Sequence, residues 1–183
     1  MRHLRRSTLI GVVFSACAVG CSQPDATADD ATANVDLKQQ AAPEIPTDCR
    51  TMLSAAVLEQ LGSTPLNHPS LLGDTPAGVQ RDGSLLCLWR HPAADTTGLF
   101  KRITRVDEAE ASKILVDLAE REGFLCYTPS GGTRCEKTWS NPTYPVIDGR
   151  TVFWRDGIFI DTQYSNLAPN GYTASIVASI FGE

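Results

Sequence analysis

The sequence predicts an α+β domain, built from an antiparallel sheet of about six strands with about three helices packed on it and held by two disulfides. Two apolar segments flank the dipeptide Asp156-Gly157, which is a strong signal for a β-hairpin. The segment after Asp107 has the apolar periodicity of an amphipathic helix. Hairpins imply an antiparallel sheet, and helices must pack on its faces to bury their apolar sides.

Six segments are predicted to be strands. In the register set by the hairpin turn, Trp154 faces Phe159 and Phe153 faces Ile160. Large apolar side chains therefore occupy both faces of this hairpin, which predicts that it lies inside the sheet and not at a solvated edge. The predicted strands are residues 84–91, 99–106, 124–127, 134–139, 151–155 and 158–164.

Three segments are predicted to be helices because their apolar residues recur on one face. Asp48 can cap the first, and Gly62 ends it. Asp107 and Glu110 form a capping box at the start of the second. The predicted helices are residues 48–61, 107–123 and 171–181.

Two connecting segments have no clear period and are candidate binding loops. Residues 63–83 are rich in Pro and Gly, and residues 140–149 carry Tyr144 between prolines. Long structureless stretches are uncommon in compact domains and often bind ligands or act as lids. Ordinary surface coil is the alternative interpretation.

The N-terminal segment has the layout of a bacterial export signal. A basic start precedes an apolar run over residues 9–19, which is shorter than the ~20 residues that a membrane-spanning helix needs. Cys21 follows at the position of a lipobox cysteine. Lipoprotein processing would attach acyl chains such as palmitate to this residue. Cys17 fits the lipobox pattern less well, and an uncleaved anchor or a plain secretory signal are the other interpretations. Each of them places the rest of the chain outside the cytoplasm.

Three parts follow from this layout: a signal peptide over residues 1–20, a tether over residues 21–46 and one α+β domain over residues 47–183. The tether is rich in Ala, Asp, Thr, Gln and Pro and has no aromatic residue, so we expect it to be disordered. A coil of about 25 residues would have an end-to-end distance of roughly 25–30 Å. The predicted location is extracytoplasmic, with the membrane bound through the lipid on Cys21.

The charge of the chain gives no reason to bind nucleic acid. Loss of residues 1–20 removes three arginines and leaves 13 basic against 21 acidic residues, a net charge of −8. An acidic chain is repelled by phosphate backbones and anionic lipids. The only local concentration of basic residues is Lys101, Arg102 and Arg105, which we interpret as the solvated face of a strand.

Four cysteines remain in the predicted domain, which indicates two disulfides in an exported protein, with three connectivities open. We favour Cys49–Cys87 and Cys126–Cys135, because the second pair flanks the turn-forming residues 128–132. A zinc site is disfavoured because no pair has the usual ligand spacing. We therefore expect no metal site and no cofactor.

Part of the sequence resembles a known family. Cys49, the pair Leu61-Gly62 and the segment Cys87-Leu88-Trp89 are similar to the Cys…Leu-Gly…Cys-x-Trp pattern of secreted actinobacterial lipoproteins of unknown function. The similarity covers roughly the first half of the predicted domain. It implies an envelope-facing α+β domain on a lipid tether, and that family offers no established catalytic residues.

Candidate site residues are few. His68 and His91 each precede a proline and could serve as a general base, although loop histidines with no catalytic part are the favoured interpretation. Asp161 lies in an apolar strand on the face of Trp154, where a carboxylate could bind a cation or meet a basic partner. The candidate binding residues are His68, Tyr144, Trp154 and Asp161.

The preferred hypothesis is a non-enzymatic, lipid-anchored envelope protein that binds an envelope protein or a small ligand. No Gly-x-Ser-x-Gly elbow, phosphate loop or calcium loop occurs, so we predict no catalytic residues. One alternative is an envelope hydrolase that uses His68 or His91. The other is a structural surface lipoprotein with no defined ligand.

Overall fold

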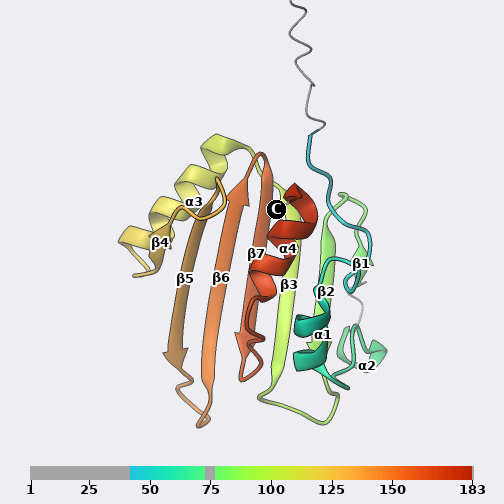
Figure 1. The fold of residues 1–183 in the computed structure, drawn as a ribbon. Helices are drawn as coiled ribbons and strands as arrows, with labels where there is room; N and C mark the ends of the chain where they lie inside the picture. The colour runs from blue at the N-terminus through green and yellow to red at the C-terminus, as the bar shows by residue number, and fades with distance from the viewer. Residues whose placement is uncertain (1–41, 73–76, 183) are drawn as a thin grey trace, which may run out of the picture. The chain divides into compact units, whose positions relative to one another are not determined.

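The computed structural model describes residues 42–72 and 77–182, and all structural statements below concern those residues. A seven-stranded antiparallel sheet forms their centre, in the order β1-β2-β3-β7-β6-β5-β4 (Figure 1). Its strands are β1 (Gly78–Val79), β2 (Leu85–Arg90), β3 (Gly98–Arg105), β4 (Leu125–Tyr127), β5 (Thr133–Ser140), β6 (Ile147–Arg155) and β7 (Ile158–Ser165). The helices are α1 (Ala55–Leu61), α2 (Pro69–Leu72), α3 (Glu108–Glu120) and α4 (Tyr172–Phe181). The predicted α+β class and the antiparallel sheet are confirmed.

The predicted hairpin of β6 and β7 lies at the centre of the sheet. Asp156 and Gly157 have φ angles of 48° and 80°, which a tight two-residue hairpin turn requires. The pairing is Trp154 with Phe159 and Phe153 with Ile160, as predicted. β3 flanks β7 and β5 flanks β6, so neither strand of the hairpin is an edge strand.

The two faces of the sheet are covered by different helices. Phe153 and Ile160 belong to a core that includes residues of α1 and α4, which lie in front of the sheet in Figure 1. Their neighbours Val152 and Phe159 pack with Leu115 of α3 in a second cluster. Because successive side chains of a strand point to opposite faces, α3 covers the face opposite to α1 and α4.

The first helix is shorter than predicted. The carboxylate of Asp48 accepts hydrogen bonds from the backbone N–H groups of Arg50 and Thr51, which closes a turn instead of capping a helix. α1 begins only after Ser54, whose Oγ accepts from the N–H of Val57. The prediction that residues 48–61 form one helix is therefore wrong for the first half of that range.

The other two predicted helices are present with nearly the expected bounds. Asp107 caps α3 by accepting a hydrogen bond from the N–H of Glu110 at 2.8 Å. α4 places Tyr172 and Ile176 in the core. Both outcomes follow from strong local signals, a capping residue and a regular apolar face.

Within residues 63–72 and 77–83, the structure contains regular elements that were not predicted. These elements are α2 and β1, and Leu66 forms an isolated bridge with Trp89. α2 has four residues and β1 has two, so neither is long enough to produce a periodic pattern. This accounts for the difference between about six expected strands and seven observed, and between about three helices and four.

Both predicted disulfides are present. Cys49–Cys87 joins the turn before α1 to β2, and Cys126–Cys135 joins β4 to β5. Trp89, two residues beyond Cys87, is fully buried. The disulfides thus attach an N-terminal segment and an edge strand to the sheet.

Within residues 42–72 and 77–182, no helix is long and apolar enough to cross a membrane. The predicted signal peptide, Cys21 and most of the predicted tether lie outside the described residues.

Candidate functional site

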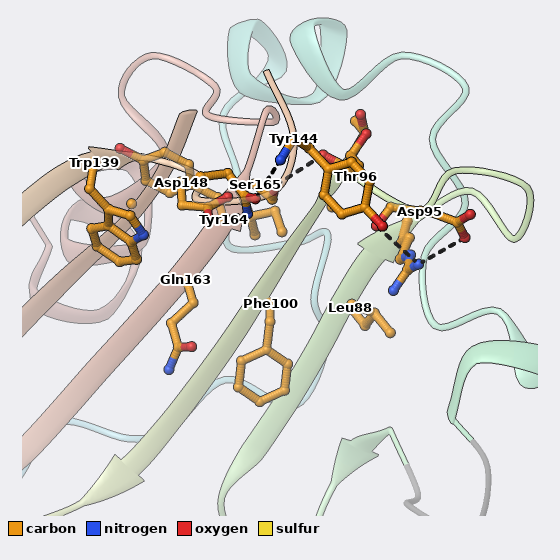
Figure 2. A pocket seen from close by; sticks show the side chains of 16 residues that line it. Leu88, Asp95, Thr96, Phe100, Trp139, Tyr144, Asp148, Gln163, Tyr164 and Ser165 are labelled. Carbon is orange, nitrogen blue, oxygen red and sulfur yellow. Dashed lines mark hydrogen bonds and ion pairs between the residues drawn. The ribbon is translucent and has the colours of Figure 1, made fainter. Parts of the chain in front are cut away.

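The face of the sheet that carries α3 is only partly covered. α3 packs over Val152, Phe159 and Cys135, which lie toward one end of the central strands. At the other end a hollow of about 420 Å³ opens on side chains from β2, β3, β5, β6 and β7. Two connections border it, residues 91–97 and 141–146, both at the lower end of the sheet in Figure 1. We call this hollow the groove, and Figure 2 shows its side chains.

The strand register explains which side chains form the floor of the groove. Gln163 lies four positions from Phe159, and Asp148 lies four positions from Val152, so both point to the α3 face. Two cross-strand rows result. One row contains Arg90, Gly98, Ser165, Asp148 and Trp139, and the next contains Leu88, Phe100, Gln163, Arg150 and Lys137.

Three aromatic rings are exposed in the groove. Trp139 of β5 retains 40% of its accessible surface, Phe100 of β3 retains 36%, and Tyr144 in the connection between β5 and β6 retains 50%. Aromatic rings of this size normally bury most of their surface, and they dominate the energetics of binding surfaces when they do not. The groove therefore has a surface that favours a ligand with apolar faces.

Tyr144 is held in place by a local hydrogen-bonded turn. The side-chain oxygen of Asn141 accepts from the N–H groups of Thr143 and Tyr144, each at 2.9 Å. The amide nitrogen of the same residue donates to Oδ2 of Asp148 at 2.7 Å. Asn141 thus ties the connection to β6, and Tyr144 is pre-positioned at the border of the groove.

The connection formed by residues 91–97 is fixed on the opposite border. The side chain of Arg90 lies over Gly98: a methyl group added to Gly98 would be 3.3 Å from Cδ of Arg90. Nε of Arg90 donates a hydrogen bond to the carbonyl of Ala94 at 2.8 Å. Ser165 of β7 donates from its hydroxyl to the carbonyl of Thr96 at 2.9 Å. Both borders are therefore attached to the sheet by side-chain hydrogen bonds.

Two polar groups on the floor keep hydrogen-bonding capacity that no described residue uses. Oδ1 of Asp148 is buried and accepts no hydrogen bond from a described residue. Gln163 is exposed, and its amide is not engaged by a described side chain. A carboxylate oxygen can only accept, whereas an amide can both donate and accept.

The sequence-predicted binding residues do not converge. Tyr144 lies at the groove. Trp154 lies beside α3, where its Nε1 donates to the carbonyl of Val106 at 2.9 Å. His68 lies just before α2, with Nδ1 2.9 Å from the hydroxyl of Ser70.

Asp161 meets a basic partner, one of the outcomes expected for it. Its two carboxylate oxygens accept from Nε and Nη2 of Arg150, each at 2.9 Å. These hydrogen bonds raise the pKa of Arg150. A bidentate pair of this kind occupies both groups, so the carboxylate is not offered to a ligand.

The two histidines of the hydrolase hypothesis are engaged locally. Nδ1 of His91 accepts from the N–H of Ala93 at 3.2 Å, and His68 contacts Ser70. Neither histidine lines the groove. Among the described residues, no group of three or more His, Cys, Asp or Glu side chains is arranged to hold a metal ion.

Sequence reasoning missed Phe100, Trp139, Asp148 and Gln163. The signal for Phe100 was available, since it alternates with the apolar positions Leu99 and Ile103 in β3 and must point to the opposite face. For the others, the sequence does not show how far α3 extends over its face. That extent decides which outward side chains stay exposed.

Lys101 corrects the interpretation of the basic strand. It points to the face of α1 and α4, where it is fully buried and its Nζ lies 2.9 Å from Sδ of Met52. The ring of Tyr172 is centred 5.8 Å from the same nitrogen. Burial lowers the pKa of Lys101 to about 7, against a smaller opposing effect of Asp48. Of this basic run, Arg102 and Arg105 are the residues exposed to solvent.

Comparison of the chain with protein-family models, with curated proteins and with solved structures finds no match.

Proposed function

We propose that this protein is a non-enzymatic, lipid-anchored binding module of the bacterial cell envelope, and that the groove holds its ligand. The observation that carries the proposal is the groove itself. Three exposed aromatic rings and the exposed amide of Gln163 line it, between two borders fixed by hydrogen bonds. A concave site with apolar walls and a few oriented polar groups is the usual form of a ligand site.

The proposed location rests on the sequence and is compatible with the disulfides. Cys49–Cys87 and Cys126–Cys135 suit an oxidising compartment outside the cytoplasm. The lipobox-like position of Cys21 supports an anchor in the membrane. The local engagement of His68 and His91 away from the groove favours binding over hydrolysis.

A sedimentation experiment tests the proposal. The full mature protein, purified in detergent, is mixed with isolated bacterial envelope material, and the bound fraction is measured after centrifugation. The double variant Trp139→Ala/Tyr144→Ala should lose at least ten-fold in affinity, because truncation of aromatic anchors removes most of the contact surface. Far-ultraviolet circular dichroism and the thermal midpoint verify that the variant is folded.

Two controls make the result specific. Tyr127 of β4 is exposed to the same extent as Trp139 but lies outside the groove, so Tyr127→Ala should bind like the wild type. The variant His68→Ala/His91→Ala should also bind normally. Equal binding by the groove variant and the wild type would exclude the groove as the site, and loss of binding in the histidine variant would favour the hydrolase hypothesis.

A further inference from the structure

We infer that the ligand of the groove is an uncharged oligosaccharide of several linked sugar rings. This inference rests on the proposed binding function and specifies its ligand class. It combines the positions of the exposed rings, the hydrogen-bonding character of the floor and the balance of charges in the groove.

The aromatic rings suit the faces of sugar rings. A sugar ring presents C–H groups on its flat faces, and these groups carry a slight positive charge that the negative face of an aromatic ring attracts. In Figure 2, Gln163 lies between Trp139 and Phe100, and Tyr144 lies beside Thr96, away from Trp139. Stacking of this kind needs accessible aromatic surface, and all three residues are exposed.

The polar floor suits the hydroxyl groups at the rims of the same sugar rings. A hydroxyl group both donates and accepts hydrogen bonds. The exposed amide of Gln163 on the floor offers both a donor and an acceptor. Gln163 pairs directly with Phe100 across β7 and β3, so a sugar ring stacked on Phe100 would place its rim hydroxyls near this amide.

The charges in the groove disfavour an anionic ligand. The guanidinium of Arg90 forms an ion pair with Asp95 at 3.7 Å, and that of Arg150 forms the bidentate pair with Asp161. A phosphate or carboxylate would therefore meet the charge of Asp148, while the one basic residue among the described residues that line the groove, Arg90, is already paired with Asp95. An uncharged ligand avoids this cost.

The dimensions favour several rings over one. β5 and β3 are separated by two strands, so Trp139 and Phe100 lie about 14 Å apart across the sheet at the usual strand spacing. A single sugar ring cannot contact both side chains. A peptide is less well suited, because extended peptides pair with sheet edges, and the central strands under the groove are paired on both sides.

Isothermal titration calorimetry of the full mature protein with uncharged hexasaccharides tests the inference. The probes are the linear hexamers of N-acetylglucosamine and of glucose, the latter in both α-1,4 and β-1,4 linkage. At least one should bind, and Trp139→Ala should weaken its affinity at least ten-fold, Gln163→Ala about five-fold and Tyr127→Ala not at all. The matching monosaccharide should bind at least ten-fold more weakly than the hexamer.

The outcomes separate the ligand class from the proposed function. If no hexasaccharide binds at millimolar concentration while envelope binding still depends on Trp139 and Tyr144, the oligosaccharide assignment is wrong and the binding function stands. Saturable binding of an uncharged hexapeptide in place of the sugars would also contradict the oligosaccharide assignment alone. If envelope binding is also independent of those two residues, both proposals fail.

Discussion

Lys101 is an amine in the hydrophobic core, and none of the residues that the structure describes forms an ion pair with it. Its described neighbours are largely uncharged: Met52 contacts its nitrogen and the ring of Tyr172 lies beyond, while the carboxylate of Asp48 acts only from a distance. Burial without a counter-ion disfavours the charged form, which is why its pKa falls from 10.5 to about 7. The residue therefore costs stability whenever it is protonated in the folded state.

This cost predicts how stability depends on pH. Below about pH 7, Lys101 is protonated in both the folded and the unfolded protein, and the full cost of burying its charge applies. Between about pH 7 and 10.5, Lys101 is protonated only in the unfolded chain. Stability therefore rises with pH across this window, by roughly 2–3 kcal/mol between pH 6 and 9 from this residue alone. Urea denaturation at pH 6, 7.5 and 9 measures it.

The variant Lys101→Met isolates this residue from the other titrating groups. Methionine keeps the aliphatic chain and removes the charge, so the variant should be more stable than the wild type by roughly 2–5 kcal/mol at pH 6. The advantage should decrease toward pH 9. A difference that stays constant with pH would contradict the role assigned to the buried charge.

The residue scale also shows the limit of prediction from sequence. The alternation in β3 separates Leu99, Lys101 and Ile103 from Phe100 and Arg102, but it does not show which set is buried. Charge favoured an exposed Lys101, and the two apolar neighbours on its face outweighed that preference. The same competition left Phe100 exposed at the groove.

The two disulfides attach the segment before α1 to β2 and the edge strand β4 to β5. Cys49–Cys87 closes a segment with a sequence separation of 38, and Cys126–Cys135 closes one of 9. In the chain-entropy description, the longer closure contributes about 4 kcal/mol and the shorter about 2.6 kcal/mol. Cys49 and Cys87 are also both buried in the main core, whereas Cys126 is only partly buried.

Removal of the disulfides should follow this order. Cys49→Ala/Cys87→Ala should lower the free energy of unfolding by more than Cys126→Ala/Cys135→Ala, with a difference of about 1–2 kcal/mol. Urea denaturation of both double variants at the same pH gives the comparison. The reverse order would mean that the β4–β5 hairpin, and not the attachment of the N-terminal segment, dominates stability.

The elements that the sequence predicts are those with strong local signals. Asp107 and the apolar face of α3, and the turn between β6 and β7, specify their structures within a few residues. The turn at Asp48 was misassigned because the same side chain can cap a helix or close a turn, and the disulfide at Cys49 constrains the chain there. The groove depends on where α3 ends over the sheet, which is a tertiary property.

At the scale of the whole molecule, the proposed function needs two separate parts. The groove is built from residues of the sheet and of two connections that hydrogen bonds attach to it. The proposed anchor is a single cysteine at the end of a predicted tether with a reach of roughly 25–30 Å. A ligand fixed in the envelope within that reach would be held by a protein that cannot diffuse away, which raises its effective concentration.

Cys21 carries the anchor, and its modification can be measured directly. Mass spectrometry of the mature N-terminus from bacterial membranes should find residue 21 as the first residue, with the mass of attached acyl chains. The Cys21→Ala variant should be released from the membrane fraction. Its affinity for the envelope ligand should stay the same, because the groove lies in a different part of the chain. The matched variant Cys17→Ala should remain processed and anchored. An unmodified or missing Cys21 in the wild type would make the protein a freely secreted one, and envelope retention would then depend on the groove alone.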